Sequence, residues 1–171
     1  MAAQFLSIGS VGVLQSSSHG TFPLSAAVTG CNRGLGLALA DRLSEKGFRV
    51  VLTSRRGIEQ SMNVAALLTA KGRDVEVYAH SLDVSNPRNI AAFCAHIERR
   101  GGIDILVNNA ATCNEGWSRD VARYTIRTNV VGPMSLSLGV LPAMIRRCGL
   151  FLLTAVPFDS CDAYQNAEMR P

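Results

Sequence analysis

The stretch AAVTGCNRGLG, residues 26–36, most constrains the fold of this chain. A short apolar run, residues 24–29, leads directly into Gly30, Gly34 and Gly36, and a helical pattern follows. An apolar run without polar alternation is typical of a parallel strand that is buried on both faces. Glycines between such a strand and a helix let the backbone turn tightly and approach a bound group closely. The stretch therefore predicts a strand, a loop that holds something, and a helix.

The remaining sequence repeats this alternation of strand and helix. Further strands are expected at residues 48–54, 74–80, 103–109 and 150–156, and helices at 35–47, 58–71, 87–100 and 118–146. A helix between two parallel strands must cross over the sheet to return the chain. The pattern predicts an α/β fold: a Rossmann-like, doubly wound parallel sheet with helices on both faces. In the first helix Leu35, Leu39 and Leu43 follow at four-residue spacing, which predicts one buried side.

The glycine loop predicts an anion site. The first turn of a helix has backbone N–H groups without helical partners, and these groups bind phosphates. The spacing G-x-x-x-G-x-G, directly after the first strand, favours the pyrophosphate of a dinucleotide, although it differs from the commoner G-x-G-x-x-G. A tight turn without a ligand is the alternative.

The end of the second strand indicates which dinucleotide is bound. It reads Thr53-Ser54-Arg55-Arg56, without the acidic residue that bonds the ribose 2′-hydroxyl of NAD. A guanidinium pairs with a 2′-phosphate, and Arg33 in the loop can reach the same group. NADP(H) is therefore favoured over NAD(H). A solvated turn is the alternative interpretation of Arg55 and Arg56.

Several motifs together resemble the short-chain dehydrogenase/reductase family, in its standard single-domain branch, over residues 24–147. TGCNRGLG resembles the family's TGxxxGxG cofactor loop, and LDV, residues 82–84, resembles the segment whose aspartate contacts adenine. NNAA, residues 108–111, is similar to NNAG with Ala111 in place of glycine. TNVVGP, residues 128–133, resembles the helix that carries the catalytic-site asparagine, here Asn129. The loop and the second strand are most similar to carbonyl-reductase-like members.

This resemblance implies NADPH-dependent reduction of a ketone or aldehyde, with a small carbonyl or alcohol substrate. It implies cofactor contacts from the following residues: Gly30, Asn32, Arg33, Gly34, Leu35, Gly36, Ser54, Arg55, Arg56, Asp83, Val84, Asn109 and Ala110. It also implies a serine, a tyrosine and a lysine. In the family the tyrosine is the general acid, the lysine lowers its pKa and binds the ribose, and the serine positions the substrate.

The Tyr-x-x-x-Lys pair is absent from this sequence. Tyr164 is followed four residues later by Glu168, and no lysine follows Lys71. A carboxylate at that position would raise the pKa of the tyrosine instead of lowering it. Thr154 and Ser160 are candidates for the serine position. We therefore expect the chain, as given, to be inactive.

Two explanations of this absence are open. The chain is either a truncated or misassembled reductase that lacks the C-terminal strands, or a short protein that kept a nucleotide-binding half. The loss of pattern after Arg147 favours the first. The alternative functions are a non-catalytic nucleotide-binding or partner-binding module and a non-functional fragment. The expected divisions are a flexible segment 1–23, an NADP(H)-binding domain 24–147, and a divergent segment 148–171 that includes the fifth strand.

Composition excludes several classes of protein. The net charge of +4 is spread without a long basic run, so a nucleic-acid partner is not expected.

The five cysteines show no CxxC pair and no zinc spacing, so no metal site is expected. They favour a reducing, cytoplasmic compartment. Cys31 is interpreted as a packing residue. Residues 1–23 contain no lysine or arginine, which leaves organellar targeting as the minor alternative. No membrane span is expected, and the oligomeric state is left open.

Overall fold

A computed structural model describes residues 24–56, 58–113, 116, 118–147 and 151–154. The strands are β1 Ser25–Val28, β2 Arg49–Leu52, β3 Val75–Val77, β4 Ile105–Asn108 and β5 Phe151–Thr154. The helices are α1 Gly34–Glu45, α2 Ile58–Ala70, α3 Pro87–Arg99, α4 Arg119–Ile126, the π-helical turn η1 Arg127–Val131, and α5 Gly132–Arg146. Each expected strand and helix is present, within a few residues of its predicted bounds.

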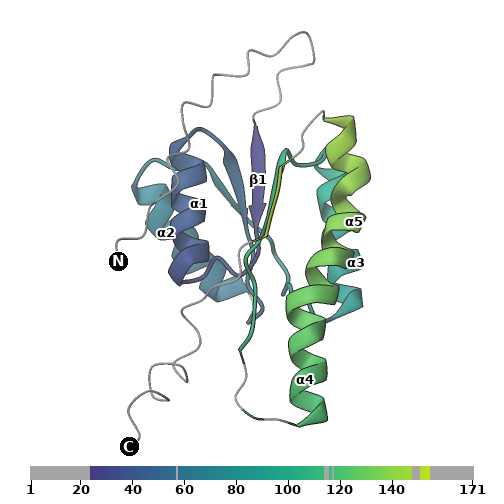
Figure 1. Ribbon diagram of the computed structural model, residues 1–171. Coiled ribbons are helices and arrows are strands. Elements are labelled where there is room, and N and C mark those ends of the chain that lie inside the picture. Colours follow the sequence, from purple (N-terminus) through teal and green to yellow (C-terminus); the bar gives the residue numbers. More distant parts are fainter. Residues whose placement is uncertain (1–23, 57, 114–115, 117, 148–150, 155–171) are drawn as a thin grey trace, which may run out of the picture.

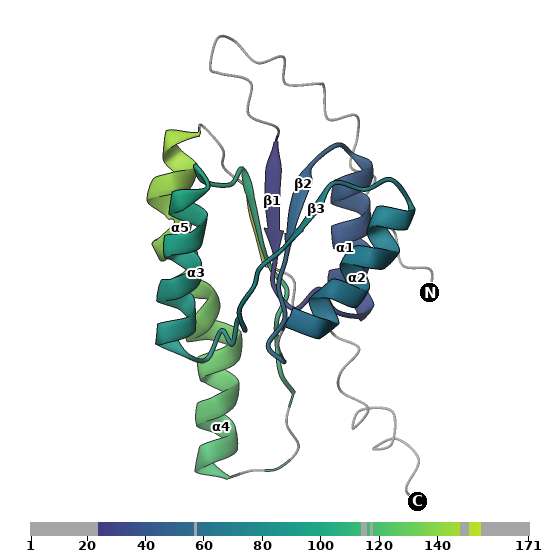
Figure 2. The same cartoon turned by 180° about the vertical axis from the view of Figure 1, so that it is seen from behind.

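The strands form one parallel sheet in the order β3-β2-β1-β4-β5. Helices α1 and α2 cover one face, and α3 and α5 cover the other (Figures 1 and 2). The chain winds outward from β1 to β3 and then crosses to β4 on the other side of β1, so the winding reverses between β1 and β4. Ligands of such sheets bind beyond the carboxyl ends of the strands at this point. The predicted α/β, doubly wound fold class is confirmed.

Each face of the sheet has its own apolar core, because successive residues of a strand point to opposite faces. Ala27 of β1 packs with Phe93 and Leu136 on the side of α3 and α5. Ala26 and Val28 of the same strand pack with Leu68 and other apolar residues on the side of α1 and α2. The central strand is therefore buried on both faces, as its unbroken apolar sequence predicted.

The buried side of α1 differs from the expected one. Its buried residues are Gly36, Ala40 and Ser44, whereas Leu35 is 46% exposed. Leu39 and Leu43 pack against the core only in part. Small residues on the inner side let α1 lie close to β1 and β2, and this close approach turns Leu35 outward. The four-residue spacing was correct, but the side that it assigned to the core was wrong at Leu35.

Helices α4, η1 and α5 form one continuous stretch, Arg119–Arg146, whose first part extends past the carboxyl edge of the sheet (Figure 1). The stretch has 28 residues and a window of mean hydropathy 1.4, so it is long and apolar enough to cross a membrane by length and composition only, a test that core helices of soluble proteins also pass. Leu136, Val140 and Met144 are buried in the core against α3. The apolar window as a whole is 39% buried. The outer side exposes large apolar residues: Ile126, Val130, Met134, Leu138 and Ile145.

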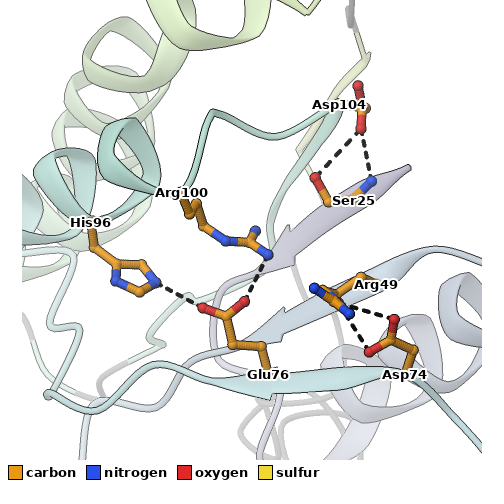
Figure 3. Close-up of polar contacts among 7 residues, drawn as sticks. All are labelled: Ser25, Arg49, Asp74, Glu76, His96, Arg100 and Asp104. Carbon is orange, nitrogen blue, oxygen red and sulfur yellow. Dashed lines mark hydrogen bonds and ion pairs between the residues drawn. The ribbon is translucent and has the colours of Figure 1, made fainter. Parts of the chain in front are cut away.

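A buried carboxylate joins the amino ends of β1 and β4 to the end of α5. Asp104 accepts hydrogen bonds from the backbone nitrogen and the hydroxyl of Ser25, at 2.7 and 3.4 Å (Figure 3). It also pairs with Arg147, through Nε at 3.0 Å and Nη2 at 2.8 Å. The side chains of Asp104 and Arg147 are only 11% and 13% exposed. This ion pair fixes the edge of the sheet opposite to the glycine loop.

Candidate functional site

The glycine loop connects β1 to α1 and leaves the start of that helix uncapped. Gly30 and Gly34 have positive φ angles of 66° and 54°, a backbone conformation that favours glycine. Arg33 occupies the N-cap position of α1 without a capping side-chain hydrogen bond, and no acidic residue lies in the first turn. A Cβ atom on Gly34 would meet no atom within 4 Å. The loop therefore presents free N–H groups and open space, as an anion site requires.

Asn109, just after β4, fixes the shape of this loop. Its Nδ2 donates to the carbonyl oxygens of Thr29 and Gly30, at 2.9 and 3.2 Å. The backbone nitrogens of Asn109 and Ala110 both donate to the Thr29 hydroxyl at 2.9 Å. A Cβ on Gly36 would lie 2.5 Å from Asn109 Nδ2, so only glycine fits there. The first and fourth strand ends thus form one rigid unit at the reversal of the winding.

Asn109 also has a hydrogen-bond acceptor without a partner among the described residues. Its Oδ1 is buried and has no hydrogen-bond partner in the part of the chain that the structure describes. A buried acceptor without a partner costs free energy, and a bound group that donates a hydrogen bond would recover it. This observation and the open loop both fit a dinucleotide at this site.

The loop is joined to the end of β2 through Cys31 and Thr53. The Cys31 thiol donates to the Thr53 carbonyl oxygen at 3.3 Å, and the Thr53 backbone nitrogen donates to the sulfur at 3.2 Å. Cys31 is fully buried, and this burial raises the pKa of its thiol to about 11. The thiol is a packing and hydrogen-bonding group, because only a thiolate is a strong nucleophile.

We expect iodoacetamide at pH 8 to leave Cys31 unmodified in the folded chain and to label it in urea, because at that pH roughly a thousandth of a thiol with this pKa is ionised. The raised pKa also makes stability depend on pH. The thiol titrates near 9.0 in the unfolded chain and near 11 in the folded one. The contribution of the buried, neutral thiol to the free energy of unfolding is therefore complete below pH 9 and is lost as the pH rises toward 11. Mass spectrometry of the Cys31 peptide checks the labelling. Equal labelling rates with and without urea would contradict the buried thiol.

A glutamine that the sequence analysis missed joins two predicted site residues. Gln60 Oε1 accepts hydrogen bonds from Asn32 Nδ2 at 3.0 Å and from the Ser54 hydroxyl at 3.2 Å. The Ser54 hydroxyl in turn accepts from the Arg56 backbone nitrogen at 3.2 Å. Asn32, Arg33 and Gln60 also line a pocket of about 420 Å³ between α1 and α2. No sequence motif singled out Gln60, because its role depends on the approach of α2 to the loop.

Three arginines give this edge of the sheet a positive charge. Arg33, Arg55 and Arg56 are exposed and make no ion pair with any described residue, whereas the ion pairs of the described part use other arginines, such as Arg49 and Arg147. An unpaired guanidinium keeps its full charge for an anion. The structure therefore places cationic groups at the ends of β1 and β2, where the sequence placed them.

Asp83 and Val84 lie in the segment between β3 and α3, shortly before the start of α3. Asp83 Oδ1 accepts hydrogen bonds from the Ser85 backbone nitrogen at 2.8 Å and from its hydroxyl at 2.7 Å. Val84 is buried, and a Cβ on Gly132 would lie 2.3 Å from its carbonyl oxygen. This close approach places the start of α5 against the segment that leads into α3. Asp83 is thereby oriented at the same edge as the glycine loop.

Asn129 lies in the π-helical turn η1, a feature often found at functional sites. Its Oδ1 accepts from the Thr112 backbone nitrogen at 2.9 Å, and its Nδ2 donates to the Thr112 carbonyl oxygen at 2.7 Å. The amide thus holds the loop after β4 against the helix. In this structure Asn129 has a positioning role, through a partner, Thr112, that the sequence did not predict.

The remaining candidates for catalysis fall largely outside the described residues. Tyr164, Glu168 and Ser160 lie there, so the structure says nothing of them. Thr154 ends β5, where its backbone is in register with Asn108 of β4. Its position is therefore at the carboxyl edge of the sheet, beside the predicted cofactor site. In the described residues no group of three or more potential metal-ligating side chains is present.

Comparison with known proteins agrees with this geometry. The profile of the short chain dehydrogenase family matches residues 25–151. The (+)-neomenthol dehydrogenase of Arabidopsis thaliana is 40% identical over 92 residues, which cover 52% of this chain and 30% of that protein. The uncharacterized oxidoreductase YusZ of Bacillus subtilis is 34% identical over 128 residues, 72% of this chain and 45% of that protein. The chain thus spans less than half the length of these curated relatives.

A solved structure supports the same classification. The crystal structure of a metagenomic short-chain oxidoreductase in complex with NADP superposes with a TM-score of 0.70 at 33% identity. The superposition covers 77% of this chain and 61% of that one. The parallel sheet, its two layers of helices and the glycine loop define a Rossmann-like α/β domain. With the match over residues 25–151, the chain belongs to the short-chain dehydrogenase/reductase family.

Proposed function

We propose that the described domain binds NADP(H) at the carboxyl edge of its sheet. The observation that carries this proposal is the unit formed by the glycine loop and Asn109, with its uncapped helix start and unpartnered Oδ1. In this proposal Gly30, Gly34 and Gly36 admit the pyrophosphate, and Asn32 and Leu35 line its approach. Asp83 and Val84 would contact the adenine, and Asn109 and Ala110, which lie beside the glycine loop, would contact the cofactor there.

The preference for NADP(H) over NAD(H) is proposed to come from charge. Arg33, Arg55 and Arg56 lack carboxylate partners among the described residues, and no acid follows β2 to repel a 2′-phosphate. Ser54 fixes the backbone of Arg56 through the hydrogen bond given above. The solved relative that contains NADP supports this choice by similarity.

Substituting Arg55→Ala should weaken NADPH binding by about 10- to 100-fold, because a hydrogen-bonded charge pair contributes about 1.5–3 kcal/mol. NADH binding should change by less than about twofold, since NADH lacks the 2′-phosphate. Titration of the purified chain, followed by the fluorescence of the bound reduced nicotinamide, measures both constants. Arg88→Ala, an exposed arginine on α3, is the control for general charge. A folded chain that binds neither nucleotide would contradict the proposed site.

The chemistry proposed for the complete family protein is reduction of a ketone or aldehyde. The bound NADPH supplies the hydride. This chain's residues bind and orient the cofactor, and Asn129 fixes the loop after β4 through Thr112. The proton donor is not identified in this sequence, because Tyr164 has Glu168 where the family has lysine. The carbonyl-reductase-like assignment, the cytoplasmic location and the divisions at residues 23 and 147 remain predictions.

We therefore expect the 171-residue chain to bind NADPH without turning it over. A panel of simple ketones, aldehydes and quinones should give no loss of absorbance at about 340 nm beyond that of the Tyr164→Phe variant. Turnover that the Tyr164→Phe substitution removes would overturn this expectation and would assign the proton donor to Tyr164.

A further inference from the structure

A hydrogen bond crosses the carboxyl edge of the sheet above the candidate site. Nη1 of Arg55, in the loop after β2, donates to the hydroxyl oxygen of Tyr124 on α4 at 2.5 Å. The two residues are 69 positions apart in sequence. Helix α4 belongs to the stretch that packs with α3 on one face of the sheet, whereas β2 leads into α2 on the other face (Figures 1 and 2). The contact therefore connects the two walls of the site.

The partner of Arg55 is a neutral phenol and not a carboxylate. Arg49 and Arg147, by contrast, pair with Asp74 and Asp104, which neutralise their charges. Arg55 makes no ion pair with a described residue, so its guanidinium keeps its charge and its other N–H donors. The Tyr124 hydroxyl accepts from Arg55, and its own proton is still free to be donated. The pair thus presents several donors and one net positive charge to an anion.

Tyr124 also restricts the motion of Arg55. An exposed arginine loses up to about 2 kcal/mol of rotamer freedom when a ligand fixes it. A guanidinium that is already held in place loses less upon binding, and this preorganisation increases affinity. Tyr124 itself is half-buried, so its ring is a firmer support than a fully exposed side chain.

We infer that Tyr124 is a positioning residue for selectivity between NADP(H) and NAD(H): it holds Arg55 toward the 2′-phosphate and adds its own hydroxyl as a donor. The inference rests on the proposed cofactor site and deepens it. The contribution of Tyr124 to affinity depends on the 2′-phosphate. Without that dianion, neither the Tyr124 hydroxyl nor the Arg55 guanidinium has a charged acceptor in the ligand.

The test uses two fragments of the cofactor, adenosine 2′,5′-bisphosphate and 5′-AMP, which differ only in the 2′-phosphate. Isothermal titration calorimetry on the full chain measures both affinities. Tyr124→Phe should weaken the bisphosphate by about 3- to 10-fold, the value of one hydrogen bond, and change 5′-AMP by less than about twofold. In an Arg55→Ala background the same substitution should have a clearly smaller effect, since its main partner is gone.

The outcomes separate the inference from the proposed function. Equal weakening of both fragments by Tyr124→Phe would show a merely structural role, and unchanged bisphosphate affinity would show no role; either result overturns the inference. If Arg55→Ala weakens binding of the bisphosphate but not of 5′-AMP, the proposed cofactor site is still supported even when the inference about Tyr124 fails. A wild-type chain that binds neither fragment overturns both. Arg123 is an exposed neighbour of Tyr124 on α4, so Arg123→Gln is the control for charge on that helix. It should leave the ratio of the two affinities within about twofold of the wild-type ratio.

Discussion

Gly36→Ser is expected to weaken NADPH binding by about 10- to 100-fold. The added Cβ would lie 2.5 Å from both Asn109 Nδ2 and the Gly30 carbonyl oxygen, and 3.0 Å from Cys31 Cα. Two of these three atoms belong to the backbone, so the clash cannot be relieved by a side-chain rotation. The loop itself must move, and loss of one backbone hydrogen bond to a charged phosphate costs about 1.5–3 kcal/mol of binding free energy. Titration with NADPH measures the loss. Overpacking should also lower the free energy of unfolding by about 1–3 kcal/mol.

Ala38→Ser is the matched control for this change. It introduces the same side chain into the same helix, but at an exposed position. Only helix propensity changes there, at a cost of about 0.5 kcal/mol. NADPH affinity should stay within about twofold of wild type. If the Gly36→Ser variant bound NADPH as tightly as the Ala38→Ser variant, the close packing of α1 against Asn109 would not define the site.

Asp104→Asn should lower the free energy of unfolding by about 3–5 kcal/mol, because it leaves the Arg147 guanidinium buried without the carboxylate that faces it. The substitution keeps the size of the side chain, so the loss reports the charge and not a cavity. It also weakens the anchoring of Ser25 at the start of β1, the central strand. Urea unfolding followed by circular dichroism measures the effect.

The chain offers an exposed pair for comparison. Arg49 and Asp74 form a two-bond contact at 3.1 and 3.0 Å, but their side chains are 45% and 55% exposed (Figure 3). Asp74→Asn should therefore lower stability by less than about 1 kcal/mol, because water screens the pair. The double substitution Asp104→Leu with Arg147→Met should recover only part of the loss, since it removes both buried charges but leaves the buried Ser25 backbone nitrogen without its acceptor. Similar effects of Asp104→Asn and Asp74→Asn would refute the burial argument.

The fold could be predicted from the sequence because its signals are local. Most strands are short, largely apolar runs, and the connections are marked by glycine or by a capping residue such as Asn86, whose side chain accepts from the Arg88 backbone nitrogen. Handedness and crossover rules then leave few topologies for such an alternation. The prediction was wrong at Leu35, because spacing defines a helical face but does not say which face the sheet accepts. That choice depended on the absent side chain of Gly36, which lets α1 approach Asn109.

The candidate site was predictable where a motif is contiguous and was missed where it is assembled from distant segments. The glycine loop, Asp83 and Asn109 belong to short motifs that follow strand ends. Gln60 and Tyr124 have no such motif. Gln60 binds Asn32 and Ser54 only because α2 packs beside the loop, and Tyr124 reaches Arg55 only because α4 extends past the edge of the sheet.

The sequence by itself determined the class of fold, the family resemblance, the glycine loop and the absence of a Tyr-x-x-x-Lys pair, since each is encoded in neighbouring residues. The tertiary structure alone decided three further features: the buried side of α1, the Asp104–Arg147 pair and the contact of Arg55 with Tyr124. The physical reason is the distance along the chain. A hydrogen bond or ion pair between residues 43 or 69 positions apart exists only after packing has brought their helices and strands together.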